Sequence, residues 1–234
     1  LKAYVNSLGI RMIGDIPIYV AMDSADAWAN PSLFQLDEKN VPYAVAGCPP
    51  DGFSATGQLW GNPLYRWEYH RQTGYEWWLK RLSHCFKLYD AVRIDHFRGF
   101  DQYYSIPYGA EDATRGHWEQ GPGIDLFNRV RQVLGEKEVI AEDLGYVTDS
   151  VRKLVYDSGF PGMKVLEFAF DSRDSGCAND YLPHNYPENS VAYTGTHDNE
   201  TLAGWFDSIT KEEQNMVRDY LCDHYTPKKY LYKS

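Results

Sequence analysis

Short apolar segments alternate along this chain with segments whose apolar residues recur every three or four positions. The apolar segments are typical of strands and the periodic ones of amphipathic helices, so the alternation predicts an α/β fold with a parallel sheet built from strand–helix units. Several of the strands are apolar enough to be covered on both faces. The expected strands are Met12–Tyr19, Ala91–Ile94, Glu138–Ala141, Met163–Phe168 and Ser190–Tyr193.

Amphipathic helices are expected between these strands. The clearest runs from about Tyr75 to Tyr89, where apolar residues recur at helical spacing. Two more are expected over about Asp125–Leu134 and Asp149–Asp157, each followed by a glycine that can end a helix. A fourth is expected after Thr210, because Thr210 and Glu213 have the spacing of a capping box.

The segment 30–74 shows little periodicity and is rich in Pro and Gly, which predicts a long loop. A loop that long is usually functional or disordered. Its aromatic residues favour function, because disordered linkers are poor in aromatic residues. The rest of the pattern shows no internal repeat, and the length favours a single domain over residues 1–234.

Composition and charge narrow the possible partners. Hydrophobic residues make up 43% of the chain and charged residues 24%, the mixture of an ordinary globular protein. The formal net charge of -10 argues against a nucleic-acid partner, since affinity for phosphates depends on clustered Lys and Arg. A neutral substrate is easier to accommodate, and the 19 Tyr, 7 Trp and 10 Phe suit stacking on sugar rings as well as core packing.

Targeting signals and cysteine spacing favour the cytoplasm. No apolar stretch is long enough to cross a bilayer, so no membrane partner is expected. No charged-then-apolar signal segment follows Leu1, and a start at Leu rather than Met suggests that the chain is an excerpt. The four cysteines lack metal-ligand spacing, which predicts reduced thiols in a cytoplasmic protein.

Three of the expected strands end in acidic residues, namely Asp95, Glu142 and Asp198. In parallel α/β architectures the C-terminal ends of the strands form the active site, so these carboxylates are expected to converge although they are far apart in the sequence. Arg93 lies two positions before Asp95, and on a strand the two side chains point the same way. The guanidinium can therefore keep Asp95 ionised.

An ionised carboxylate can act as a nucleophile, and a second carboxyl group in a drier setting can keep its proton and donate it to a leaving group. This assigns complementary roles to Asp95 and Glu142. Retaining glycosidases use two such groups about 5–5.5 Å apart. From spacing alone, two alternatives stay open: a structural ion pair with helix-capping acids, and a metal site that uses His96, His197 and Asp198, although no ligand spacing supports the metal.

Five stretches of the chain, from Gly14 to Thr201, resemble in the same order the 4-α-glucanotransferases of the α-amylase superfamily, also called amylomaltases or disproportionating enzymes. Any one short motif would be weak, whereas five in order are highly specific. The stretches are GDIPIYVAMDSADAWANPSLF, PPDGFSATGQLWGNPLY, YDAVRIDHFRGF, VIAEDLG and TGTHDNET.

The resemblance implies a (β/α)8 TIM barrel, of which this chain would supply about strands 3 to 7 with their helices as one partial catalytic domain. It implies an enzyme without metal or organic cofactor that transfers α-1,4-glucan segments between maltooligosaccharides by a retaining double displacement. Asp95 would be the nucleophile, Glu142 the general acid/base, and Asp198 the stabiliser of the transition state.

The resemblance also implies a set of substrate-binding residues. Arg93 would orient Asp95, Asp15 would belong to the donor-sugar site, and His197 would assist Asp198. The long loop would surround the acceptor sugar, and its residues that match the family's acceptor site are Phe53, Gln58 and Trp60.

Two other functions are weighed against transfer. A related retaining α-glucan hydrolase would share the carboxylates but not the acceptor stretch from Gly57 to Pro63. The family enzyme is about twice as long as this chain, and five strands cannot close an eight-stranded barrel. The excerpt alone is therefore also considered as a glucan-binding fragment with weak or no activity.

Overall fold

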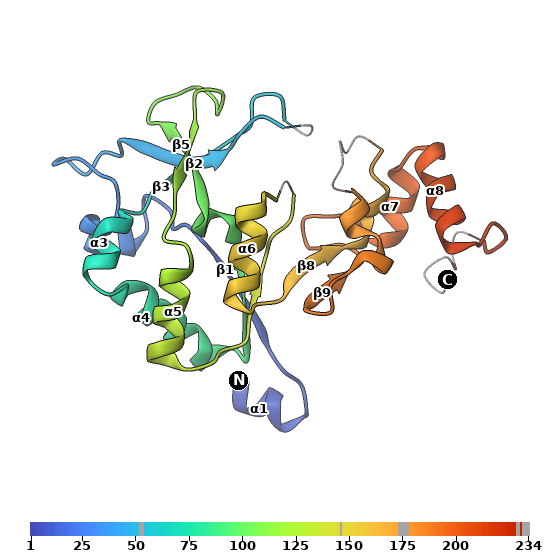
Figure 1. The fold of residues 1–234 in the computed structure, drawn as a ribbon, viewed down its shortest axis with the longest axis horizontal. Coiled ribbons are helices and arrows are strands. Elements are labelled where there is room, and N and C mark those ends of the chain that lie inside the picture. The colour runs from blue at the N-terminus through green and yellow to red at the C-terminus, as the bar shows by residue number, and fades with distance from the viewer. Residues whose placement is uncertain (52–53, 146, 173–177, 228–229, 231–234) are drawn as a thin grey trace. The chain divides into compact units, whose positions relative to one another are not determined.

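A computed structural model describes residues 1–51, 54–145, 147–172, 178–227 and 230. The chain divides into two compact units, Leu1–Pro161 and Gly162–Ser234. Each contains parallel strands and helices, so the fold is of the α/β type with parallel sheet, as the alternating pattern predicts (Figure 1).

Three parallel strands form the centre of the first unit: β1 (Ile13–Pro17), β4 (Ala91–Asp95) and β7 (Val139–Ala141). β4 lies between the other two, and its register places Asp15 of β1 opposite Arg93. The three strands lie within the predicted segments or extend one residue beyond them. Their apolar side chains explain this agreement, because Val92 and Ile94 are fully buried.

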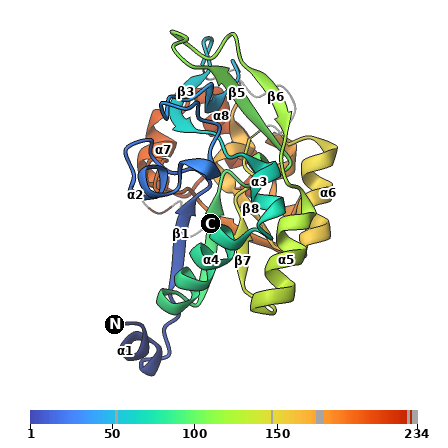
Figure 2. The same ribbon diagram turned by 90° about the vertical axis from the view of Figure 1, so that its left-hand side faces the viewer.

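Amphipathic helices pack against the core of this unit, as their spacing predicts (Figures 1 and 2). In α4 (Glu76–Leu88) the apolar stripe buries Trp78, Leu82 and Cys85. The predicted helices α5 (Ile124–Leu134) and α6 (Asp149–Ser158) are also present, and Thr148 caps α6 by accepting a hydrogen bond from the Val151 N–H. The remaining helical segments of this unit are α1 (Lys2–Ser7), α2 (Ala25–Ala29), η1 (Pro31–Leu33), α3 (Trp67–Gln72) and η2 (Phe97–Phe100).

The prediction of one long loop over 30–74 differs from the structure, which has strands and helices there. β2 (Ala44–Cys48) pairs antiparallel with β3 (Gln58–Pro63) and with β5 (Gln102–Pro107), and β5 pairs with β6 (His117–Gln120). These short strands form a second sheet, whose strands β3, β5 and β6 can be seen in Figure 2. They carry no regular apolar alternation, so only their pairing with distant partners reveals them.

The helix predicted from Tyr75 begins one residue later, because the chain turns sharply between α3 and α4. Gly74 and Tyr75 both have left-handed backbone conformations, with φ of 63° and 59°.

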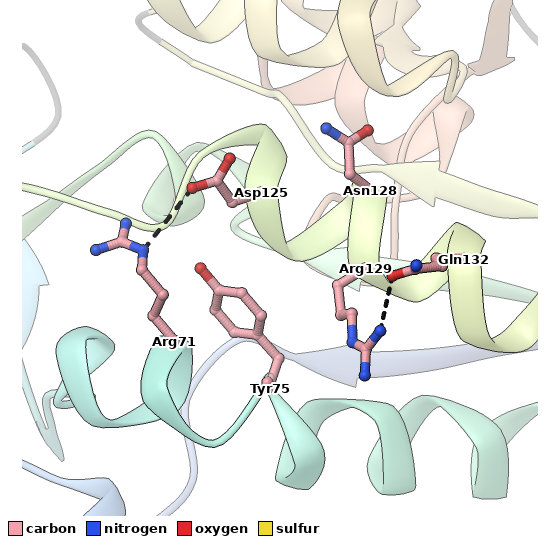
Figure 3. A pocket seen from close by; sticks show the side chains of 7 residues that line it. Arg71, Tyr75, Asp125, Asn128, Arg129 and Gln132 are labelled. Atoms are coloured by element: carbon pink, nitrogen blue, oxygen red, sulfur yellow. Dashed lines mark hydrogen bonds and ion pairs between the residues drawn. The ribbon is translucent and has the colours of Figure 1, made fainter.

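A shallow pocket of about 460 Å³ lies at the turn between α3 and α4, beside α5 (Figure 3). On its walls Arg71 faces Asp125 at 3.8 Å, and Arg129 donates a hydrogen bond to Gln132 at 2.7 Å.

In the second unit, β8 (Gly162–Val165) pairs in parallel with β9 (Ser190–Tyr193), and β9 has the predicted bounds. The predicted strand Met163–Phe168 ends early, because the chain enters the 3-10 helix η3 (Leu166–Phe170). Two short 3-10 helices follow, η4 (Ala178–Tyr181) and η5 (Pro183–Asn185).

The α-helices in the described part of this unit are α7 (Leu202–Ser208) and α8 (Lys211–Leu221). The capping box predicted for Thr210 and Glu213 is present at the start of α8. Among the described residues, none of the helices has the length and apolar character needed to span a membrane.

Candidate active site

Arg93 bridges two carboxylates at the C-terminal end of the parallel sheet. Its Nη1 atom lies 2.7 Å from Oδ2 of Asp15, and its Nη2 atom lies 2.7 Å from Oδ1 of Asp95. The alternation of side chains along β4 and the register with β1 put all three groups on one face. The arginine side chain is only 12% exposed, whereas those of Asp15 and Asp95 are 50% and 46% exposed. The planar guanidinium therefore holds both carboxylates in place while they remain accessible to solvent.

Glu142 follows β7 and is tied to the backbone next to Asp95. Its Oε2 atom accepts a hydrogen bond from the His96 N–H at 2.7 Å, and its Oε1 atom accepts one from the Leu144 N–H at 3.0 Å. Burial, together with the negative charge of Asp95, raises the pKa of Glu142 to about 7. The two N–H donors favour the ionised form but do not outweigh these effects.

Asp95 and Glu142 therefore have different environments: Asp95 forms an ion pair with Arg93, whereas Glu142 is shielded from water by burial. This difference is the one that separates a nucleophile from a proton donor in carboxylate pairs. In the described part of the chain, no three His, Cys, Asp or Glu side chains lie close enough together to hold a metal ion.

His96 connects the two carboxylates to the second sheet. Its backbone is left-handed, with φ of 52°, which turns the chain after β4 and aims its N–H at Glu142. Its ring meets the ring of Trp60 edge-on, with 4.8 Å between centroids. Burial lowers the pKa of His96 to about 3, so the imidazole is neutral at physiological pH. A strained non-glycine residue at this position is typical of functional sites.

The two described residues of the predicted acceptor group lie on β3. The Trp60 Nε1–H donates a hydrogen bond to Oε1 of Gln58 at 2.9 Å. The centroid of the Trp60 ring also lies 6.2 Å from that of the Tyr19 ring. The structure thus brings Trp60 next to the catalytic candidates through His96, while Gln58 is exposed. Phe53 lies outside the described residues.

The predicted residues His197 and Asp198 belong to the second unit, on the turn that follows β9. Nε2 of His197 lies 3.4 Å from Oδ2 of Asp198, and both side chains are exposed, at 68% and 75%. The turn is closed by Asn199, whose Oδ1 atom accepts hydrogen bonds from the N–H and hydroxyl of Thr196. Both side chains are therefore presented to solvent from an ordered turn.

A family model described as 4-alpha-glucanotransferase matches residues 1–233 of the chain. The chain belongs to the 4-α-glucanotransferase family. It is 52% identical over 222 residues to the 4-alpha-glucanotransferase of Clostridium butyricum, covering 94% of this chain and 45% of that protein. It is 51% identical over 225 residues to the enzyme of that name from Thermus thermophilus, covering 95% and 44%. The chain thus spans about half the length of the curated relatives it matches.

Solved structures of the family agree with the fold. The amylomaltase from Streptococcus agalactiae in complex with acarbose superimposes with a TM-score of 0.92 at 43% identity, over 98% of this chain and 46% of that one. The amylomaltase from Corynebacterium glutamicum, at 21% identity and a TM-score of 0.74, is similar in fold. A structure of this 4-α-glucanotransferase family therefore shares the arrangement of strands and helices given above.

Two residues of this family member stand out in the structure although sequence reasoning assigned them no role in a carboxylate site. His96 entered only as a possible metal ligand, and its left-handed backbone has no sequence signal beyond its place after a strand. Glu167 is 4% exposed in the second unit. An acidic residue inside the apolar run Met163–Phe168 was the signal that could have found it.

Proposed function

We propose that this chain forms the catalytic part of a 4-α-glucanotransferase, which transfers α-1,4-glucan segments between maltooligosaccharides with retention of configuration. The observation that carries the proposal is the pair formed by Asp95, held by Arg93, and Glu142, whose burial raises its pKa to about 7. A cation beside Asp95 favours its ionised form and burial favours the protonated form of Glu142, which are the two states that a retaining double displacement uses.

In the first step an oxygen of Asp95 attacks the anomeric carbon of the donor sugar, and the glycosidic bond breaks. Glu142 gives its proton to the leaving oxygen, so the shorter glucan departs with a free hydroxyl group. In the second step the hydroxyl of an acceptor glucan loses its proton to Glu142 and attacks the same carbon. The bond to Asp95 breaks, and both carboxyl groups return to their starting states.

Arg93 and Asp15 support this chemistry from the sheet. Arg93 orients Asp95 and stabilises its charge, because its guanidinium contributes one N–H to each of two carboxylates. Asp15, half exposed beside them, is positioned to accept hydrogen bonds from hydroxyls of the donor sugar. Asp198, assisted by His197, would bind hydroxyls of the distorted sugar and stabilise the positive charge that develops at its anomeric carbon.

Transfer requires that a sugar rather than water reaches the intermediate. The proposed acceptor group is Gln58 and Trp60, together with Phe53. Support comes from Trp60, whose ring lies against the ring of His96, the residue that follows Asp95. A sugar stacked at this place would displace water from the reacting carbon, which favours transfer over hydrolysis.

Within the family's architecture, we assign this chain to about strands 3 to 7 of a (β/α)8 barrel. The parallel pairs of each unit and the carboxylates at strand ends support the assignment.

The proposed substrate and compartment agree with the composition of the chain. Linear α-1,4-glucans are neutral, which suits a chain of net charge -10. The thiols of Cys48, Cys85 and Cys222 are free, which is consistent with a reducing compartment such as the cytoplasm.

The proposal is tested by incubating the full-length protein with maltotriose. Glucose together with a ladder of longer maltooligosaccharides is the expected product mixture. Glucose and maltose alone would identify a hydrolase, and bound but unconverted sugar would identify a glucan-binding protein; either result contradicts the proposal.

The nucleophile is tested by Asp95→Asn, which we expect to abolish the ladder while the thermal unfolding midpoint stays close to that of the parent. Asp157→Asn is the matched control, because among the described residues Asp157 forms its ion pair with the exposed Lys153, one helical turn away on α6. A ladder that persists in Asp95→Asn, at the rate of the control, would refute the assignment.

A further inference from the structure

Glu167 is a buried acid of the second unit that the proposed mechanism does not use. It lies in η3, directly after β8, and is 4% exposed. Within the described part of the chain, its Oε1 atom has no hydrogen-bond partner. A buried carboxyl oxygen without a hydrogen-bond partner is costly, so the presence of Glu167 here needs an explanation.

The backbone of Glu167 is joined to the turn that carries His197 and Asp198. Its N–H donates a hydrogen bond to the carbonyl oxygen of Thr194 at 3.1 Å, which continues the pairing of β8 with β9 by one more connection. The first residue of the turn, Thr194, is therefore held by a backbone hydrogen bond to η3.

The side chain of Glu167 packs directly on the same turn. A Cβ atom at Gly195 would lie 2.9 Å from each carboxylate oxygen, closer than side chains approach one another. A side chain at position 195 would require the carboxyl group of Glu167 to move. The carboxyl group is thus in contact with the backbone two residues before His197, and its charge or position can change the shape of the turn.

The charges around Glu167 disfavour its ionisation. Burial is the larger cause and the carboxylate of Glu200, at the end of the same turn, is the second; together they raise the pKa of Glu167 to about 7. The nearest cation along β8, Lys164, lies over the ring of Tyr181 at 5.4 Å. His197 pairs with Asp198, 3.4 Å away.

Among the described residues, the elements that contact η3 most, η4 and α8, do not add a cation to the groups that shift the pKa of Glu167. On η4 the charged residue is Asp180, which is acidic. On α8, Glu213 binds Ser172 and Thr210, and Arg218 lies over Phe206 at 5.5 Å. Protonated Glu167 can rest against Gly195, whereas ionised Glu167 meets the charge of Glu200.

We propose that Glu167 is a positioning residue whose protonated side chain holds the turn 194–200 in the shape that presents His197 and Asp198 to the sugar. Ionisation of Glu167 beside Glu200 loosens this turn and lowers the rate of transfer. The inference rests on the proposed function, because it takes Asp198 as part of the catalytic group.

The test compares Glu167→Gln with the parent protein. Glutamine has the same shape and cannot ionise, so it keeps the turn in place at every pH. The ratio of kcat for Glu167→Gln to kcat for the parent should stay near one at pH 6 and rise by about tenfold between pH 7 and pH 8.5, the factor that ionisation of one group with a pKa near 7 allows. Because Glu142 ionises in both proteins, its effect cancels in the ratio. A ratio that does not change with pH would overturn the proposal.

Coupling to Gly195 gives a second measurement. Gly195→Ala should lower kcat in the parent, because the new methyl group displaces the carboxyl group, but much less in a Glu167→Ala background, where the space is empty. Equal losses in both backgrounds would refute the contact.

Failure of the proposed function is recognised separately, because the ladder of oligosaccharides would then persist in Asp95→Asn or Asp198→Asn. If both of these variants are inactive and the kcat ratio of Glu167→Gln to parent does not change with pH, only the role of Glu167 is refuted.

Discussion

The ring of Trp60 meets the ring of His96 edge-on, with 4.8 Å between their centroids. Trp60 belongs to β3 of the antiparallel sheet, and His96 follows Asp95 at the end of the parallel strand β4. One aromatic contact therefore joins the proposed acceptor group to the proposed nucleophile, so a change at Trp60 should affect how the intermediate is used.

We expect Trp60→Ala to lower the ratio of transfer to hydrolysis by about tenfold, because loss of an aromatic contact of about 0.5–1.5 kcal/mol and of the stacking surface leaves the acceptor less well bound than before. The ratio is measured from maltotriose as longer oligosaccharides formed against reducing ends released. Trp28→Ala is the control, since Trp28 is 85% exposed on α2. An unchanged ratio in Trp60→Ala would remove Trp60 from the acceptor group.

Arg93→Lys should lower kcat by about 10- to 100-fold with little change in fold. A lysine ammonium is a point charge and cannot reach Asp15 and Asp95 with separate N–H groups, so one charged hydrogen bond of about 1.5–3 kcal/mol is lost. Steady-state kinetics and thermal unfolding check this. Arg11→Lys, which alters the exposed pair with Glu138, should be indistinguishable from the parent; an equal loss there would show that the effect is not local.

The parallel strands and the main helices could be predicted from the sequence, whereas the antiparallel sheet could not. Val92 and Ile94 belong to an apolar run that is buried whatever its neighbours are. β3, in contrast, contains the left-handed Gly61 and ends at Pro63, and neither residue signals a strand. Its place is set by pairing with β2, a contact between segments that local propensity does not encode.

The candidate site divides in the same way. Arg93 and Asp95 stand two apart on a predicted strand, so their ion pair could be expected from spacing alone. The bond from Arg93 to Asp15 depends on the register between β1 and β4, and the bond from the His96 N–H to Glu142 depends on a left-handed residue. Neither can be read from a local pattern. Glu167 acquires its contact with Gly195 only when β8 and β9 pair.

Transfer should decrease with rising pH, following the ionisation of Glu142. Burial and the charge of Asp95 raise its pKa to about 7, so the carboxyl group holds its proton below that value and loses it above. We expect kcat for maltotriose to fall as pH rises through about 7, with the decrease approaching tenfold per pH unit.

Glu142→Gln should lower kcat by about 10²–10⁴-fold because it removes the general acid. A maltosyl donor with a fluoride leaving group needs no proton, so its first step should keep most of its rate in Glu142→Gln; equal loss with both donors would contradict the role.

The same shift predicts an effect on stability. Between pH 4.5 and about 7 the folded protein holds a proton on Glu142 that the unfolded chain has released, so the free energy of unfolding falls as pH rises through this window. Glu142→Gln removes this contribution. The stability of the variant relative to the parent should therefore increase from pH 4.5 to 7, as urea unfolding at a series of pH values would show. A constant difference would mean that Glu142 ionises normally in the folded protein.

Glu213 should produce the opposite dependence in the second unit. Burial would raise its pKa, but hydrogen bonds from the Ser172 and Thr210 backbone and side chains outweigh burial and lower the pKa to about 2. A lowered pKa stabilises the fold above the unfolded value near 4.5, and this contribution is lost as pH falls from 4.5 towards 2. Glu213→Gln should be less stable than the parent at pH 6, with a difference that shrinks towards pH 3 in urea unfolding. Glu212→Gln, at the neighbouring exposed position, is the matched control and should show no such trend. A Glu213→Gln difference that stays constant from pH 6 to 3 would mean that the capping box at Thr210 does not depend on the ionised carboxylate.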